Sequence, residues 1–166
     1  MATTSSLPRV ARHHHDAIQP HVDRLPELAG MIGRVEPDVL ASAFEPECRF
    51  ITDQLVPHMA AIEGALYARL EEVMDGRHSM APMRDEHDLL RRLLSSLCVY
   101  RAEVQAGGLT EADEIGLRRV LYRLYTILKV HLAEEEQYLA VLDHALSDEE
   151  KDRLALGLEH ATAEPL

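Results

Sequence analysis

The residues with the clearest chemical potential are a histidine and a glutamate that interrupt an apolar helical pattern. Apolar residues recur in steps of three and four over residues 121–142, and His131 and Glu135 occupy two positions of this stripe. Such a stripe faces the core of a helical protein, so both side chains are expected inside, one turn apart on the same face. Because a buried carboxylate is costly unless it is paired or coordinated, the pair indicates a polar site within the core.

Each of the other long predicted helices directs at least one histidine to the same interior. His87 and His58 each continue the apolar stripe of their own helix, whereas His14, His15 and His21 flank the stripe of the first helix. A single inward histidine is more often a hydrogen-bonded core residue than a ligand. Four helices that each contribute one, close to glutamates, instead predict a metal site.

The predicted ligands also agree in depth along a bundle. If consecutive helices alternate in direction, the 1.5 Å rise per residue places His15, His87 and Glu135 about two to three turns from the same end. His58 and His131 then lie about one to two turns deeper. A nearly constant offset relates three pairs of residues: His15 with His87, His58 with His131, and Glu63 with Glu135. Two similar helix pairs are how helical bundles hold dinuclear metal sites.

The elements that position these residues are amphipathic helices, because strand signals are nearly absent. Helices are expected over residues 8–32, 46–74 (with a short turn at 38–43), 79–106, 110–146 and 147–160. Stops at Gly33, Asp75-Gly76 and Gly107-Gly108 and a capping box at Thr110 with Asp113 support these limits. Pro20 and Pro57 are expected to bend helices beside the ligands or around the core. The fold class is therefore all-α: an up-down-up-down four-helix bundle over about residues 8–146, with a short C-terminal fifth helix, in a single domain of 166 residues.

Composition narrows the function classes. The chain has 17 basic and 29 acidic residues and a formal net charge of −12, which argues against nucleic acid and anionic membranes as partners. Cys48 and Cys98 form no CxxC pair, and neither a signal peptide nor a membrane span is visible, so a cytoplasmic protein is expected.

The histidines in their order and spacing resemble the hemerythrin-like HHE cation-binding family. The segments that carry the resemblance are RHHHDAIQPHVDRL, LVPHMAAIEGALY, MRDEHDLL and KVHLAEEEQY, with His15, His58, His87, His131 and Glu135 at the ligand positions. The resemblance covers roughly residues 8–146 and implies a bundle around a non-haem di-iron centre. Its cofactor would be two iron ions with an oxo or hydroxo bridge. The ligand types alone would equally accept zinc or manganese.

The chain departs from the family pattern in two helices. Where the family has a carboxylate four residues after the second-helix histidine, this chain has Ile62, and Glu63 follows one position later. Glu63 is the candidate replacement, with Tyr67 as a fallback oxygen donor, and Ile62 predicts an open coordination position. The third helix lacks a second histidine near His87, so His21 is a candidate for the fifth imidazole. The predicted metal ligands are thus His15, His21, His58, Glu63, His87, His131 and Glu135.

The resemblance implies a protein that binds or senses a small ligand, namely dioxygen, nitric oxide or peroxide. An enzyme of oxidative or nitrosative defence that removes peroxide or nitric oxide is the alternative. A metal-free helical interaction module would leave the buried histidines unexplained, and a ferritin-like oxidase is disfavoured because no histidine has a glutamate three residues before it. A reductase or signalling partner, and a monomeric or homodimeric state, both remain open at this point.

Overall fold

The computed structural model describes residues 7–75, 77 and 79–163, and the side chains at 8–14 and 157–163 are outside this description. The elements are α1 (Leu7–Met31), α2 (Pro37–Phe50), η1 (Ile51–Leu55), α3 (Val56–Ile62), η2 (Glu63–Tyr67), α4 (Ala68–Val73), α5 (Ala81–Ala106), α6 (Glu111–Ala145) and α7 (Asp148–Ala163). All regular structure in this part of the chain is helical, which confirms the predicted fold class. None of the described helices is long and apolar enough to cross a membrane.

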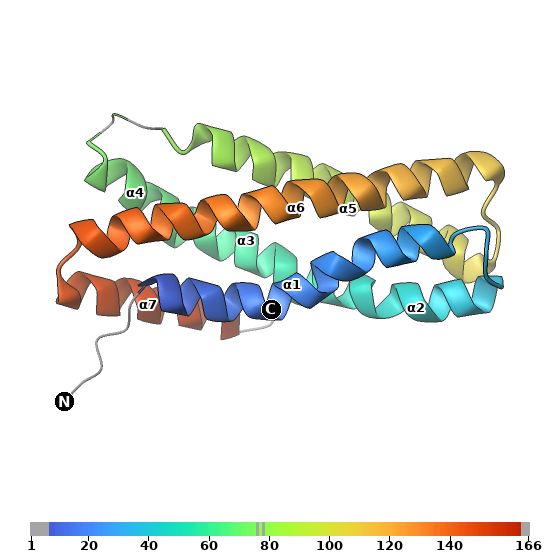
Figure 1. The fold of residues 1–166 in the computed structure, drawn as a ribbon, viewed down its shortest axis with the longest axis horizontal. Helices are drawn as coiled ribbons and strands as arrows, with labels where there is room; N and C mark the ends of the chain where they lie inside the picture. The colour runs from blue at the N-terminus through green and yellow to red at the C-terminus, as the bar shows by residue number, and fades with distance from the viewer. Residues whose placement is uncertain (1–6, 76, 78, 164–166) are drawn as a thin grey trace.

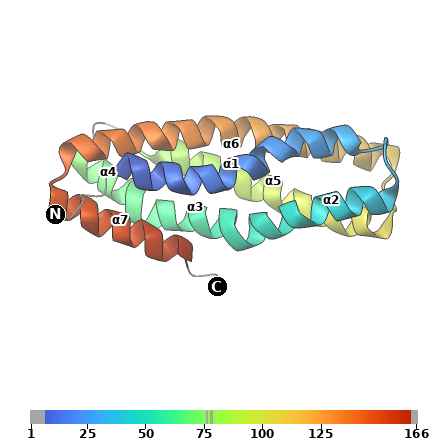
Figure 2. The ribbon, with the colours of Figure 1, turned by 60° about the horizontal axis from the view of Figure 1, so that its bottom comes forward.

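The helices form an antiparallel bundle with one additional helix. α1 runs along the molecule, the segment from α2 to α4 returns, α5 runs forward again and α6 returns (Figure 1). α1 packs most extensively against α6, and α5 contacts both α6 and α2. α7 then turns back and packs along α3 and α1 (Figure 2). This is the predicted up-down-up-down order with a C-terminal fifth helix.

Local geometry confirms the predicted helix limits at Gly33, Gly107 and Thr110, whereas Gly76, part of the predicted stop of the second helix, lies outside the described residues. The Thr110 hydroxyl accepts a hydrogen bond from the Asp113 N–H (3.2 Å), and the Thr110 N–H donates to the Asp113 carboxylate (3.0 Å). This reciprocal pair satisfies two backbone donors that the start of α6 would otherwise leave open. Gly33 and Gly107 have φ angles of 67° and 64°, which glycine adopts without steric cost after α1 and α5.

Removal of this cap gives a first testable expectation. Thr110→Ala loses the hydroxyl acceptor at the start of α6, so we expect a loss of about 1 kcal/mol in unfolding free energy and a decrease in Tm of about 2–4 °C. Calorimetry would measure it. The matched control is Thr126→Ala, because the Thr126 hydroxyl donates only within the helix, to the Tyr122 carbonyl (2.9 Å). Equal effects of the two substitutions would show that the capping box contributes nothing.

The second predicted helix is longer and less regular than expected. The separate turn at 38–43 and the helix at 46–74 are one helical segment from Pro37 to Val73, interrupted by the π-helical turns η1 and η2. Pro46 does not start a helix but lies within α2, where burial of the apolar face outweighs the missing backbone hydrogen bond. In η1, just before Pro57, the Val56 N–H bonds to the Ile51 carbonyl. Such π turns widen a helix locally and occur often at functional sites.

The core is divided into two apolar clusters with polar residues between them. One cluster contains the apolar residues of α2 and the adjoining parts of α1, α5 and α6. The other contains those of η2, α4 and the facing ends of α5, α6 and α7. Five buried polar residues lie on the helices at heights between the two clusters: His15, His58, His87, His131 and Glu135. The fold therefore holds a layer of five polar residues between two apolar clusters, and Glu47 of α2 is a further buried polar residue outside this layer.

Candidate metal centre

The centre is organised around the carboxylate of Glu135, which is only 1% exposed. Its Oε2 lies 3.2 Å from His15 Nε2 and 3.7 Å from His58 Nε2. Its Oε1 lies 3.3 Å from His131 Nε2 and 3.8 Å from His87 Nε2. Each carboxylate oxygen thus faces one pair of histidines, and in each trio the three donor atoms lie within 4.8 Å of one another. The two trios, which share Glu135, are two groups of residues that could each hold a metal ion.

The bundle topology explains why these five residues meet. α6 supplies His131 and Glu135 one turn apart on one face, and α5, α3 and α1 each supply one histidine at the same height. Five of the seven residues predicted as ligands are therefore brought together. The other two, His21 and Glu63, belong to neither trio in the described part of the chain.

Three of the histidines have a carboxylate on the ring nitrogen that faces away from the centre. The Nδ1 contacts are Glu136 to His15 (3.2 Å), Glu63 to His87 (2.7 Å) and Glu86 to His131 (2.8 Å). A carboxylate at this nitrogen fixes the ring orientation and leaves Nε2 as the metal-facing atom. The histidines are thus oriented as metal ligands usually are.

Glu63 has this supporting position instead of the predicted ligand position. Its carboxylate accepts from Arg91 (2.7 Å) as well as contacting His87 Nδ1, and it lies at the edge of the bundle. The physical reason is that a residue five positions after His58 lies about 100° around the helix from the apolar stripe. Ile62, which takes the family's carboxylate position, is buried in the apolar cluster.

Tyr67 reaches the centre where Glu63 does not. Its hydroxyl donates to Glu135 Oε1 (3.1 Å) and lies 3.2 Å from His87 Nε2, and the side chain is fully buried. Burial, followed by the charge of Glu135, raises the pKa of Tyr67, so the hydroxyl remains a proton donor. Of the two candidate oxygen donors in η2, Tyr67 is therefore the one that contacts the residues of the trios.

The supporting position of Glu63 can be tested by mutation. Glu63→Gln keeps the side-chain shape but weakens the bond to His87 Nδ1, so we expect a decrease in metal affinity of roughly 10–100-fold. Competition with a chromogenic chelator would measure it. Asp88→Asn is the matched control, because Asp88 bonds to the same Arg91 (2.9 Å) without touching a histidine. Complete loss of one metal in Glu63→Gln would instead indicate that Glu63 is a direct ligand.

His21 lies outside the centre and pairs with a glutamate that the sequence analysis missed. Its Nδ1 lies 2.7 Å from the carboxylate of Glu47, which also accepts from Arg24 (2.9 Å). Glu47 follows Phe44 by three residues on the buried face of α2, so the apolar phase of that helix would have found it. His14, the other candidate from the first helix, has a side chain outside the described residues.

The electrostatics of the centre favour an ionised Glu135. Burial opposes ionisation, but the contacts with His131, His15 and His58 outweigh it and hold the pKa of the Glu135 carboxyl well below its usual range. Burial likewise opposes protonation of His131, and the contacts with Glu135 and Glu86 reverse this and raise its pKa. In contrast, burial and repulsion from His131 lower the pKa of His87. The centre therefore contains the ionised carboxylate of Glu135 surrounded by imidazoles.

The donor set suits a divalent cation. His87 Nε2 and His131 Nε2 face each other at 2.7 Å, and each ring has a carboxylate at its Nδ1. Two neutral rings that both donate from Nδ1 direct the lone pairs of their Nε2 atoms at each other. A cation between the rings would satisfy both nitrogens at once. Imidazole nitrogens with a carboxylate oxygen are typical ligands of iron, zinc and manganese, so the residues present fit such an ion.

Fold and site together define a class of protein. A four-helix bundle whose facing helices direct histidines and a shared carboxylate inward is a helical-bundle metalloprotein. The chain belongs to the hemerythrin HHE cation-binding domain family, whose model matches residues 7–151. No curated protein and no solved structure gave a significant match.

Proposed function

We propose that the protein is a non-haem di-iron protein that binds or senses a small ligand of the dioxygen, nitric oxide and peroxide class. The observation that carries the proposal is the division of the Glu135 carboxylate between two histidine pairs. Each trio has two histidines and one carboxylate oxygen, a composition typical of non-haem iron(II) sites with open positions. His15 and His58 would hold one ion, His87 and His131 the other.

The surroundings of the centre support ligand binding rather than inert storage. Ferrous iron, when bound, would supply the electrons that such a small ligand accepts. The protein's part is to hold the imidazoles in one orientation through Glu63, Glu86 and Glu136 and to exclude water with the apolar clusters on both sides. Tyr67 adds a buried proton donor beside Glu135.

Metal analysis of the full chain tests the proposal. Protein purified in air should contain about two irons per chain, as expected for a dinuclear bundle site, with charge-transfer bands in the near-ultraviolet and visible spectrum. The reduced protein should bind dioxygen or nitric oxide. An iron content that stays near one ion per chain after anaerobic reconstitution with ferrous iron would contradict it. Steady turnover of peroxide or nitric oxide would assign the protein to the defence enzymes.

A further inference from the structure

A small cavity lies inside the bundle beside the metal centre. Its volume is about 10 Å³, and most of its lining is apolar. That is close to the minimum that admits one water-sized molecule. Leu55 and Leu128 form part of its wall, and each lies three residues, about 4.5 Å of helix rise, before a histidine of the centre. The wall formed by Leu55 and Leu128 is therefore about one turn from His58 and His131. The lining residues Val22, Leu94 and Leu124 lie about two turns from the histidines of their own helices.

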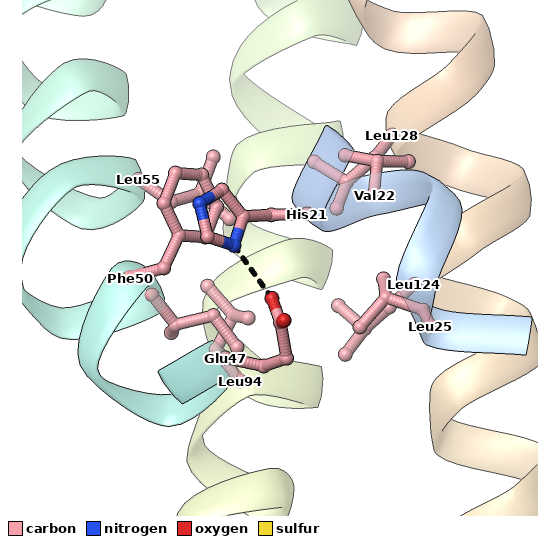
Figure 3. Close-up of a pocket in the computed structure, with 10 residues that line it drawn as sticks. His21, Val22, Leu25, Glu47, Phe50, Leu55, Leu94, Leu124 and Leu128 are labelled. Carbon is pink, nitrogen blue, oxygen red and sulfur yellow. Dashed lines mark hydrogen bonds and ion pairs between the residues drawn. The ribbon is translucent and has the colours of Figure 1, made fainter. Parts of the chain in front are cut away.

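The cavity is separated from an outer groove by two stacked rings. The groove is lined by polar residues of α2 and η1 and has a volume of about 560 Å³. His21 and Phe50 line both the groove and the cavity. Their rings stack with centroids 3.8 Å apart and planes within 7°, as Figure 3 shows. The stacked rings of His21 and Phe50 thus lie between the groove and the cavity.

Glu47 holds the His21 ring of this stack in place. Its side chain is 3% exposed and its carboxylate contacts His21 Nδ1, whereas the His21 side chain is 32% exposed (Figure 3). Arg24, itself half exposed, bonds to the same carboxylate. The wall behind the stack includes residues of η1, which is a π-helical turn. An outward turn of the His21 ring would break its stack on Phe50 and its bond to Glu47, whose carboxylate would keep the bond from Arg24.

We propose that the cavity is a transit site for an uncharged diatomic ligand and that the His21–Phe50 stack is its gate. The proposal rests on the proposed function and narrows it. The apolar lining admits dioxygen or nitric oxide with little loss of solvation, but hydrogen peroxide would have to give up its hydrogen bonds to water. The residues of this path therefore select for a diatomic gas over peroxide.

The first measurement detects the cavity without using iron chemistry. The full chain loaded with zinc, a diamagnetic metal that these ligands accept, would be placed under dissolved oxygen, and paramagnetic relaxation of methyl groups measured by NMR. Methyl groups of Val22 and Leu124, which line the cavity, should relax faster than those of Val104 and Leu117. The latter two are equally buried in the same cluster but do not line it. Equal relaxation of all four would overturn the proposal.

The second measurement tests transit in the iron-loaded protein. Val22→Ile places one more methyl group in the cavity and should slow nitric oxide association by roughly tenfold, equivalent to about 1.4 kcal/mol. Peroxide reaction rates should not change. The matched control is Val104→Ile. Conversely, His21→Ala removes the gate and should accelerate association, with His144→Ala as the control for loss of an exposed histidine.

The two measurements separate the possible failures. Unchanged nitric oxide association in both Val22→Ile and His21→Ala would reject the path while leaving the metal function intact. If the wild-type iron protein binds no diatomic ligand at all, the proposed function fails, and the oxygen relaxation data still decide whether the cavity admits a gas. Leu124→Met, a volume-conserving change in the cavity wall, checks that any slowing reflects blockage rather than a disturbed core.

Discussion

Glu135→Gln is expected to lower metal affinity by more than roughly 100-fold, beyond the range found when a supporting partner of a ligand is lost. The substitution removes the one carboxylate that faces both histidine pairs, so both metal positions lose an anionic ligand together. It also removes the charge that raises the pKa of His131 and His15. Metal content after dialysis, with a chelator titration, would measure the effect.

The neighbouring residue provides the control for this substitution. Glu134 precedes Glu135 in the same acidic run but is only partly buried and belongs to neither histidine trio. Glu134→Gln changes the net charge equally and should leave the metal content unchanged. Retention of one tightly bound ion in Glu135→Gln would contradict a shared carboxylate. It would show that one trio binds metal through its histidines alone.

The five residues of the two trios could be predicted from the sequence, because helical periodicity gives the direction of each side chain and the helix lengths give its height in the bundle. His131 and Glu135 interrupt a regular stripe, and a reversal of direction at each loop places His15, His58 and His87 at one level. The helix stops that set those heights are local signals, such as the capping box and the glycines with positive φ. Such signals depend only on residues that are close together in the sequence.

Local sequence was not sufficient to predict the roles of three residues: Glu63, Tyr67 and His21. Periodicity gives the direction of a side chain around an ideal α-helix, but the segment containing Glu63 and Tyr67 is the π turn η2, in which one turn contains more residues. Tyr67 is thereby buried against Glu135, whereas Glu63, at the start of the π turn, stays at the edge where regular helical geometry places it. His21 lies on the flank of its stripe, where the nearest partner comes from another helix. Its pairing with Glu47 depends on tertiary packing that no local spacing encodes.

Removal of the metal is expected to destabilise the whole bundle. The polar layer lies between two apolar clusters, and a metal that binds only the folded chain stabilises it by about 4 kcal/mol at a thousandfold excess over Kd. For a chain of this length that corresponds to a difference in Tm of roughly 8–16 °C between metal-loaded and metal-free protein. Calorimetry of the full chain before and after chelation would measure it.

Two variants show whether this difference arises at the centre. Glu135→Gln should lose most of this metal-dependent shift in Tm, because weaker binding of the ion couples less free energy to folding. Thr110 lies at the end of α6 that is far from the centre. Thr110→Ala should therefore lower the Tm of the metal-loaded and the metal-free protein equally and retain the full difference between them, since distant sites act additively. A wild-type Tm that does not respond to chelation would mean that the histidines and Glu135 are satisfied by one another. The buried layer would then be a hydrogen-bonded network and not a metal centre.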